Sequence, residues 1–274
     1  FDEESVDVLR FFARLKCRLM PYLYAAGVEA HETGVPVMRP MLLEFPDDPA
    51  ADTLDRQYML GPALLVAPVM SYDGQVDYYL PAGRWTHLLS GAVVEGGRWV
   101  REQHGFLSLP LLVRPNTALI LGDNDQRPDY DYSDGFTLQV YGLEDGAAVQ
   151  AIIHAADGSP AGTFSVQRTS NTVSVQWQGS PQHWRLLLVG VPSVASVSGG
   201  AAETTAGGVQ VTPVYGAAEL AVRLGCADDV TYDTTIPVQD SVIPMPPPHR
   251  ADSPRTGLLQ VHGAVLLFGL AGLF

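Results

Sequence analysis

Cysteine is scarce in this sequence, which has only Cys17 and Cys226 among 274 residues. The two lie far apart, and no Cys-x-x-Cys or His-Glu-x-x-His motif is present, so no metal-binding spacing is recognisable. The sequence leaves one disulfide open and favours two buried free thiols. Because no Asn-x-Ser/Thr sequon occurs and the chain starts at Phe1 rather than at Met, neither a compartment nor a targeting segment is assigned.

Basic residues are also few. The chain carries 16 Lys and Arg against 30 Asp and Glu, which gives a formal net charge of -14 and an isoelectric point near 4.7. A negative field of this size repels phosphate backbones, and no cluster of Lys and Arg reverses it locally. We therefore expect no nucleic-acid partner. A neutral ligand such as a sugar is compatible with this charge but is not implied by it.

Motifs for nucleophilic or metal chemistry are missing too. No nucleophile elbow, phosphate-binding loop or metal-binding histidine pair occurs. His31, followed by Glu32, lies near the end of a predicted helix, where the favoured interpretation is a C-terminal cap rather than a catalytic base. The sequence therefore predicts no cofactor-binding site.

Three aspartates, Asp129, Asp131 and Asp134, invite comparison with a calcium loop. An EF-hand needs glycine at its sixth position and glutamate at its twelfth. Counted from Asp129, Gly135 is the seventh residue and Val140 the twelfth, so the spacing fails. The group predicts a turn before a strand rather than a metal site.

The first 30 residues have the pattern of a helix. Asp2 can cap it, and apolar residues recur at helical spacing through residues 8–19. The basic stripe Arg10, Arg14 and Arg18 is interpreted as a solvated or carboxylate-paired face. Pro21 is expected to end or kink the helix near Met20. A short strand over 37–41, ending near Glu44, and a short helix over 52–60 are predicted next.

From residue 61 onward, apolar runs between Gly and Pro punctuation predict antiparallel β-sandwiches. In the segment that begins at Phe136, Leu138 and Val140 share one face while Thr137 and Gln139 point away, as in a half-buried strand. The predicted strands cover residues 63–69, 75–80, 85–88, the neighbourhood of Trp99, 107–121, 136–141, 149–154, 162–168, 172–178, 184–189, 209–214 and 219–224.

Four aromatic residues in the first β region could form a sugar-stacking platform: Trp85, Trp99, Tyr78 and Tyr79. Aromatic residues in a sandwich are more often core residues, and we favour that interpretation.

The carboxyl-terminal end changes character after Cys226. A proline-rich stretch at 244–254 is expected to be extended, and the run 257–274 is uncharged and of about transmembrane length. A membrane anchor, a glycosylphosphatidylinositol signal, suggested by the small residues Ala251 to Ser253, and an out-of-frame gene end all remain open. Membrane contact is expected only through this tail, and the oligomeric state is left open.

Residues 1–121 closely resemble glycoside hydrolase family 31, the retaining α-glucosidases and α-xylosidases. The resemblance is carried by the segments LRFFARLKCRLMPYLY, GVPVMRPMLLEFPDD, DRQYMLGPALLVAPV, YYLPAGRWTHLLSG and HGFLSLPLLVRPNTALILG. The words RPDYDYSDGFTLQVYGLEDG, residues 127–146, look most like the α-xylosidase branch.

The resemblance implies a mainly β fold, with two antiparallel β-sandwich domains preceded by the terminal elements of a (β/α)8 barrel. It divides the chain into a barrel remnant (1–60), a proximal sandwich (61–122), a distal sandwich (123–225) and a tail (226–274). The parent would be an exo-acting retaining glycosidase that needs no cofactor and binds α-xylosides. Its two catalytic aspartates would lie upstream of Phe1, so the resemblance assigns no catalytic residue to this chain, which is expected to be inactive alone.

The carboxylates in this chain agree with that expectation. Retaining glycosidases need two of them across the scissile bond. Most Asp and Glu residues here lie in turn contexts, and Glu44 alone has a position typical of a barrel site. We expect Glu44 to pair with Arg39 as a structural contact. The rival hypothesis is a non-catalytic carbohydrate-binding or scaffold module.

Overall fold

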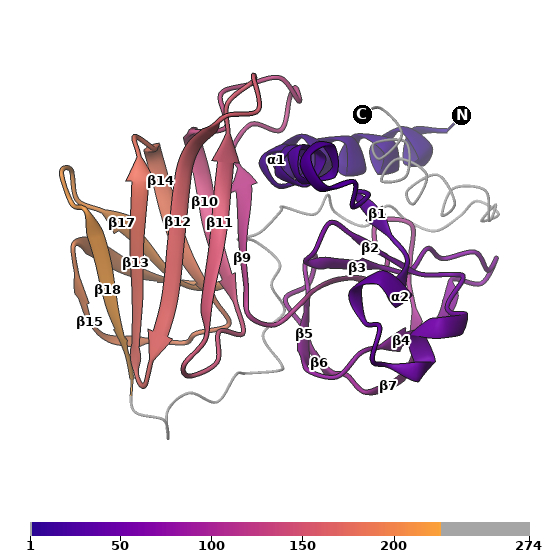
Figure 1. Ribbon diagram of the computed structural model, residues 1–274. Coiled ribbons are helices and arrows are strands. Elements are labelled where there is room, and N and C mark those ends of the chain that lie inside the picture. The colour runs from indigo at the N-terminus through magenta and orange to yellow at the C-terminus, as the bar shows by residue number, and fades with distance from the viewer. Residues whose placement is uncertain (1, 226–274) are drawn as a thin grey trace.

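The computed structural model describes residues 2–225, which form one long helix and two β regions (Figure 1). Cys226, the proline-rich stretch 244–254 and the apolar run 257–274 lie outside the described residues. Among residues 2–225, no helix has the length and apolar character needed to cross a membrane.

Helix α1 (Glu3–Thr33) confirms the predicted amino-terminal helix. The Asp2 side chain accepts a hydrogen bond from the Ser5 N–H at 2.9 Å and so caps the first turn. At the other end Gly34 adopts the left-handed conformation (φ 78°) and its N–H donates to the Ala30 carbonyl. In Figure 1, α1 lies above the first β region, and one end of it lies beside β9 of the second region.

Pro21 was expected to end or kink the helix, and it does not end it, because α1 continues for 12 more residues, to Thr33. Proline lacks an N–H, so the carbonyl of Cys17, four residues earlier, loses its helical donor. The Tyr130 hydroxyl supplies the missing bond and donates to the Cys17 oxygen at 2.9 Å. A residue from the second β region thus satisfies the carbonyl that Pro21 leaves without a helical donor. Cys17 itself is a buried free thiol, as expected.

The first β region forms a six-stranded sheet in the order β1-β2-β3-β8-β5-β6 and a separate ribbon of β4 and β7. Its elements are β1 (Met38–Arg39), α2 (Met41–Glu44), η1 (Pro49–Thr53), β2 (Tyr58–Leu60), β3 (Leu64–Val66), β4 (Gln75–Leu80), β5 (Arg84–His87), β6 (Val93–Glu95), β7 (Arg98–Gln103) and β8 (Leu111–Val113).

Two local predictions in this region are wrong. The helix expected over 52–60 is instead the short turn η1 followed by β2, because all three β2 residues are buried between β1 and β3. The single strand expected over 107–121 is two strands, separated by Pro115 and by Asn116, whose φ is 55°. β1 and β2 lie in the same sheet as β3, and the proposed division of the chain at residue 60 stays a prediction.

The second β region consists of two five-stranded sheets, in the orders β16-β17-β14-β10-β9 and β11-β12-β13-β18-β15. The strands are β9 (Thr117–Gly122), β10 (Asp134–Tyr141), β11 (Ala148–His154), β12 (Pro160–Thr169), β13 (Thr172–Gly179), β14 (Gln182–Val189), β15 (Val194–Ser198), β16 (Gly200–Thr205), β17 (Gly208–Pro213) and β18 (Glu219–Leu224). The predicted mainly β fold is confirmed, although β10 and β14 pair in parallel.

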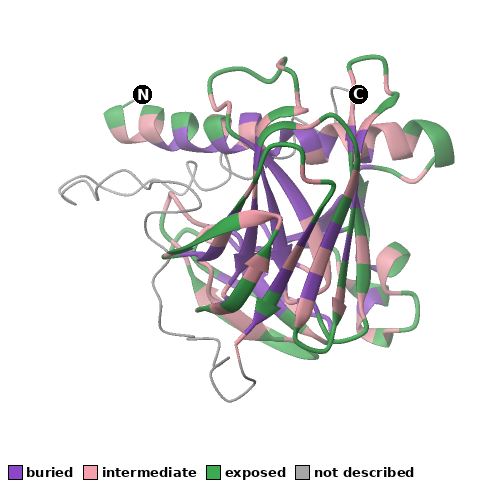
Figure 2. Ribbon diagram, turned by 90° about the vertical axis from the view of Figure 1, so that its left-hand side faces the viewer, coloured by how far each residue is buried: buried purple, intermediate pink, exposed green. Residues whose placement is uncertain are grey.

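Within their sheet, the three strands β9, β10 and β14 are buried on both faces over most of their length. Along β9, Ile120 belongs to the core of the second β region, whereas Leu119 and Leu121 belong to the core shared with α1 and the first region. The half-buried strand predicted at Phe136 is therefore wrong: Thr137 and Gln139 are also buried. Gln139 accepts a hydrogen bond from the Tyr141 hydroxyl at 2.6 Å. Figure 2 shows buried segments on the inner strands and exposed segments on the outer strands and loops.

The contact between Tyr130 and Cys17 generates a testable prediction. Replacing Tyr130 by Phe removes the donor to a carbonyl that Pro21 leaves without a helical partner, so the free energy of unfolding should fall by about 1–2 kcal/mol. In a Pro21→Ala background, the N–H of the new alanine can donate to the same carbonyl. Tyr130→Phe should then cost much less, as measured by urea unfolding of all four chains.

Tyr132→Phe is the matched control, because the Tyr132 hydroxyl donates locally to the Pro128 carbonyl. Its effect should be the same with and without Pro21. An equal loss for Tyr130→Phe in both backgrounds would contradict the assigned role of Tyr130.

Candidate functional site

The one barrel-type carboxylate predicted from the sequence, Glu44, lies beside Arg39 where α1 meets the first sheet. Antiparallel pairing of β1 with β2 turns Met38 toward solvent and buries Arg39. Pro40 then ends the strand, and Glu44 is the last residue of α2 rather than of a strand. The local sequence thus points the Arg39 side chain toward the contact between α1 and the first sheet. It also places Glu44 within hydrogen-bonding distance of Arg39.

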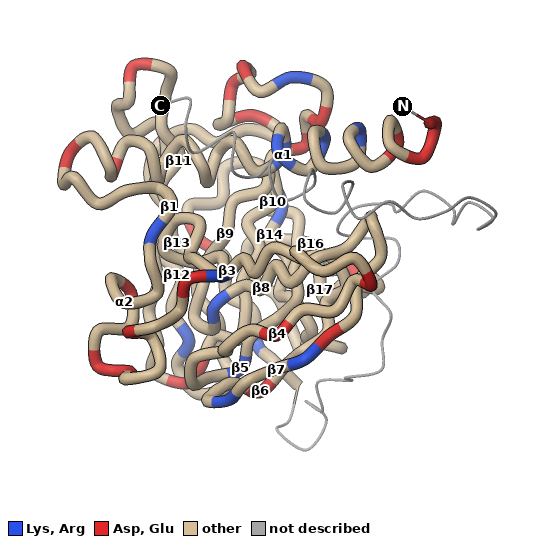
Figure 3. The backbone as a smooth tube through the Cα atoms, turned by 90° about the vertical axis from the view of Figure 1, so that its right-hand side faces the viewer, with Lys and Arg blue, Asp and Glu red and all other residues tan. Residues whose placement is uncertain are grey.

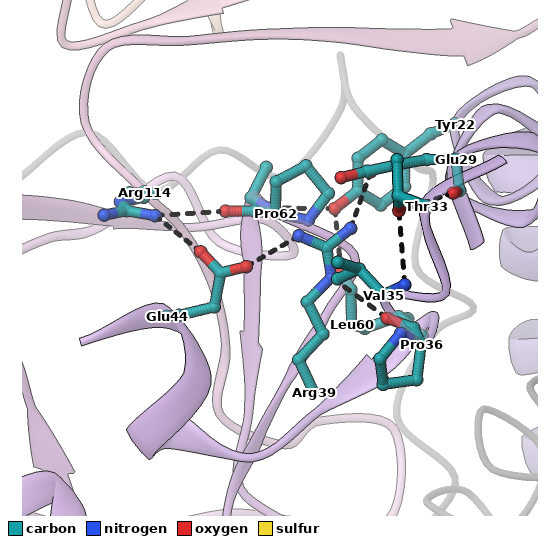
Figure 4. A network of polar contacts seen from close by, with 11 residues as sticks. Tyr22, Glu29, Thr33, Val35, Pro36, Arg39, Glu44, Leu60, Pro62 and Arg114 are labelled. Atoms are coloured by element: carbon teal, nitrogen blue, oxygen red, sulfur yellow. Dashed lines mark hydrogen bonds and ion pairs between the residues drawn. The ribbon is translucent and has the colours of Figure 1, made fainter. Parts of the chain in front are cut away.

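Arg39 is the centre of an ion-pair network (Figure 4). Its side chain is 4% exposed, and its two terminal nitrogens contact Glu29 Oε2 and Glu44 Oε1, each at 2.6 Å. The Arg39 Nε donates to the Pro36 carbonyl at 3.0 Å. Glu29 belongs to α1 and Glu44 to α2, so one guanidinium joins the helix to the sheet. The predicted pairing of Arg39 with Glu44 is confirmed.

The second oxygen of Glu44 is also occupied. Arg114 Nη1 contacts Glu44 Oε2 at 3.0 Å, and the Arg114 guanidinium lies 4.6 Å from the centre of the Phe45 ring. Burial would lower the pKa of the Arg39 guanidinium, but hydrogen bonds and charges from Glu44 and Glu29 outweigh burial and raise the pKa above its ordinary value. Glu44 is therefore held by two cations, which is an architectural contact.

Tyr22 completes the junction. Its hydroxyl donates to the Leu60 carbonyl at 2.6 Å and accepts from the Ala63 N–H at 2.9 Å (Figure 4). Gly61, between these partners, has a φ of 61°, and a Cβ atom added there would lie 2.4 Å from the Tyr22 hydroxyl. The turn between β2 and β3 therefore requires glycine, because the helix approaches it so closely.

A groove of about 700 Å³ lies beside this network, between α1, the segment after β8 and β11. Its walls are mainly apolar, with Ala26, Pro62 and Ile152 among them. Of its charged residues, Glu29 and Arg114 are engaged in the ion-pair network, and Glu32 is the other carboxylate in the lining. No pair of free carboxylates is found among these lining residues.

A second polar cluster joins the β4–β7 ribbon to β5, and sequence reasoning missed it. The two oxygens of Glu102 contact His87 Nε2 at 3.0 Å and His104 Nε2 at 2.9 Å. Burial would raise the pKa of Glu102, but the hydrogen bonds from His104 and His87 outweigh it and lower the pKa to about 2. The Glu-x-His spacing was visible in the sequence, whereas the contribution of His87 from another strand was not.

The remaining candidates fall on turns, the surface or the core. Asp131 accepts hydrogen bonds from the N–H and hydroxyl of Ser133, and Asp134 contacts the exposed His183. His31 is exposed and lies in the last turn of α1. The cap of this helix end is the Gly34 N–H, which donates to the Ala30 carbonyl. Among residues 2–225, no group of three or more His, Cys, Asp or Glu side chains is arranged to hold a metal ion.

The four aromatic residues proposed as a platform separate into two pairs. Trp85 and Tyr78 are buried core residues, as favoured from the sequence. Tyr79 is half-buried and Trp99 is 62% exposed, and their rings face each other on the outer side of the ribbon.

Comparisons with known proteins agree with this architecture. Residues 34–119 match the glycosyl hydrolase family 31 C-terminal domain, and residues 131–224 match the C-terminal domain of α-xylosidase YicI. The chain is 41% identical over 153 residues to an α-xylosidase of Emericella nidulans, which covers 53% of this chain and 20% of the relative. It is 34% identical over 183 residues to α-xylosidase XylQ of Lactiplantibacillus pentosus. This match covers 65% of this chain and 24% of XylQ.

A solved structure supports the fold. The family 31 dextranase of Flavobacterium johnsoniae superposes with a TM-score of 0.63 at 19% identity, covering 75% of this chain and 31% of the dextranase. The two matched models place the first and second β regions among the C-terminal domains of glycosyl hydrolases. The chain belongs to glycoside hydrolase family 31. It spans about a quarter or less of the length of these two curated relatives.

The Arg39 network predicts a large stability effect. Arg39→Met removes one of the two cations that hold the mostly buried Glu44 and also removes the partner of Glu29, so the free energy of unfolding should fall by about 3 kcal/mol. Arg84→Met is the matched control, because Arg84 pairs with Glu95 at the surface. It should cost under about 1 kcal/mol. Chemical unfolding measures both, and similar losses for the two variants would contradict the central role of Arg39.

The Glu102 cluster predicts a pH dependence. Its folded pKa of about 2 lies below the ordinary 4.5, so its stabilisation is present above pH 4.5 and is lost as the pH falls toward 2. Glu102→Gln should lower stability by about 3 kcal/mol at neutral pH, and the difference from the wild type should shrink through that window.

The surface variant Glu95→Gln is the control for that experiment, and its stability should follow the wild-type pH curve. A constant gap between wild type and Glu102→Gln from pH 7 to pH 2 would show that Glu102 does not carry the effect.

Proposed function

We propose that this chain is the C-terminal, non-catalytic part of a retaining, exo-acting α-xylosidase, which removes terminal α-linked xylosyl residues. The match of residues 131–224 to an α-xylosidase C-terminal domain carries the proposal. The two α-xylosidase relatives support it. An α-glucosidase parent is the second candidate, because an α-glucosidase of Bacillus thermoamyloliquefaciens is 32% identical over 173 residues.

In this proposal, α1, β1 and α2 are terminal elements of a (β/α)8 barrel. Apolar side chains on these elements support the assignment: Val6, Leu9, Met38, Leu42 and Leu43 are each 38–50% exposed. Large apolar groups on a surface commonly mark a contact with another protein surface. The barrel of the parent would cover them, and the Arg39 network would hold the first β region against α1.

The chemistry proposed for the parent needs two carboxyl groups about 5–5.5 Å apart, one as nucleophile and one as acid and then base. In residues 2–225 the best-placed carboxylates have other partners. Glu29 and Glu44 share the Arg39 guanidinium, and the pKa of Glu102, near 2, leaves it without a proton to donate at neutral pH. The catalytic aspartates of the parent would therefore come from sequence outside this chain.

This proposal predicts that the purified 274-residue chain does not hydrolyse p-nitrophenyl α-xyloside. Both carboxylates and the sugar subsite would be missing, and with them the covalent step and substrate positioning that supply most of the barrier lowering. Released nitrophenol is measured beside a full-length family 31 α-xylosidase.

Glu44→Gln serves as the control for contamination. A trace rate that is unchanged in Glu44→Gln does not depend on Glu44, and it belongs to a contaminant only if it separates from the chain on further purification. A rate above roughly a thousandth of that of the full-length enzyme, lost in Glu44→Gln, would place the active site in this chain and overturn the proposal.

The parent itself is tested by expressing the complete open reading frame that contains residues 1–274. Higher activity on p-nitrophenyl α-xyloside than on the α-glucoside supports the α-xylosidase assignment, and the reverse preference favours the α-glucosidase.

A further inference from the structure

The β4–β7 ribbon presents a polar and aromatic surface that the proposed function does not use. Alternation along β4 buries Val76, Tyr78 and Leu80. The residues between them face solvent, opposite their partners on β7. We call this face the outer strip, and it consists of three directly opposed pairs: Tyr79 with Trp99, Asp77 with Arg101 and Gln75 with Gln103. Figure 3 shows β4 and β7 side by side on the face turned to the viewer.

The aromatic end of the outer strip is exposed yet ordered. Trp99 is 62% exposed, and its ring meets the Tyr79 ring at a centroid distance of 5.9 Å and an angle of 64°. Cross-strand aromatic pairs stabilise a ribbon, but that purpose does not require a tryptophan to remain mostly in water. Exposed tryptophan and tyrosine are enriched at recognition sites, because they offer large rigid area with a polar edge.

Three hydrogen bonds hold both the backbone and the side chain of Tyr79 in place. The Gln57 side chain accepts from the Tyr79 N–H and donates to the Tyr79 carbonyl, both at 2.7 Å. Gln57 is itself buried. Its side-chain amide takes the place of a neighbouring strand at the edge of β4 that does not pair with β7. The Tyr79 hydroxyl also donates to Asp48 Oδ2 at 2.9 Å. The ring is therefore held in place before any ligand arrives, which lowers the entropic cost of binding.

The polar part of the outer strip is planar and has no net charge. Arg101 binds Asp77 through two parallel bonds, Nε to Oδ1 at 2.6 Å and Nη2 to Oδ2 at 2.9 Å. The Gln103 amide donates to the Asp73 carbonyl at 3.3 Å, and Gln75 lies opposite it. The four residue steps along β4 span about 13 Å, which is the scale of a short oligosaccharide.

We propose that the outer strip is a non-catalytic binding site for a neutral oligosaccharide. One sugar ring would lie against the exposed face of Trp99, and its neighbours would hydrogen-bond to the Asp77–Arg101 pair and the two glutamine amides. A pyranose has an apolar C–H face and a hydroxyl edge, which matches an aromatic pair followed by planar polar groups. Single-stranded nucleic acid also stacks on aromatic rings, but it needs a positive groove, and this chain has a net charge of -14.

The test follows the indole N–H signals of the full 274-residue chain. The sequence has four tryptophans, so labelling them gives four nitrogen–proton resonances, and Trp99→Phe identifies the one from Trp99. The probes are isoprimeverose, isomaltotriose, maltotetraose and cellotetraose. At least one probe should shift the Trp99 signal saturably, while the signal of the buried Trp85 stays in place.

Variants then locate the site. Trp99→Ala should weaken binding of that probe about tenfold or more, measured by titration calorimetry. Asp77→Asn should weaken it by a smaller factor. Tyr215→Ala is the matched control, because Tyr215 is a fully exposed aromatic residue outside the ribbon, and it should leave the affinity unchanged.

Three results would overturn the proposal: no shift of the Trp99 signal with any probe up to its solubility limit, equal weakening by Trp99→Ala and Tyr215→Ala, or a Trp99 shift that follows protein concentration without sugar. The last result would assign the outer strip to contact with a second copy. None of these results depends on hydrolysis of α-xylosides, so this test and the test of the proposed function fail separately.

Discussion

The architecture depends on burial of both faces of one sheet. β9, β10 and β14 present alternate residues to two different cores, so that Leu186 and Leu188 pack inside the second β region while Leu187 and Val189 pack toward α1 and the first region. Burying apolar surface on both sides contributes about 25 cal/mol for each Å² removed from water. The two regions therefore share hydrophobic stabilisation, and polar contacts across the junction fix their orientation.

Polar side chains that are buried between α1 and the two β regions need partners there. Arg39, Tyr22 and Arg18 each reach from one element to a group on another, and Arg18 Nε donates to the Gly122 carbonyl at 3.0 Å at the end of β9. Buried charges and hydroxyls are costly unless they are satisfied, so each imposes a strict geometry on its partner. This explains why Glu29 and Glu44, the two carboxylates that contact Arg39, have an architectural role.

The alternation of apolar and polar residues predicted the strands whose burial follows that alternation. The strands over 75–80 and 219–224 were predicted with their observed bounds, because apolar and polar residues alternate along them. β15 and β16 were missed, since Ala, Ser, Glu and Thr dominate them and most of their residues are exposed. Thr137 and Gln139 look like surface residues by type, yet α1 and the first region bury their side of the sheet. A single sequence does not show which neighbour will cover a face.

In the candidate sites too, contacts between residues close in sequence were predicted and contacts between distant segments were not. Arg39 and Glu44 are five residues apart, and their pairing was predicted. Glu29 and Arg114 come from other parts of the chain and were not foreseen as partners. His87 joins Glu102 only because β5 and the ribbon pack together. The parallel pairing of β10 with β14 also escaped prediction, because it joins segments nearly 50 residues apart.

The position of β18 has a consequence for synthesis on the ribosome. β18 lies between β13 and β15, and it is the last described strand of the chain. Until residues 219–224 leave the exit tunnel, β13 has a row of backbone groups that lack their partner strand and are open to other chains or to a chaperone. The first β region can complete its own sheet more than 100 residues earlier, at β8. The nascent chain therefore passes through a long interval in which one region is assembled and the other still exposes an open edge.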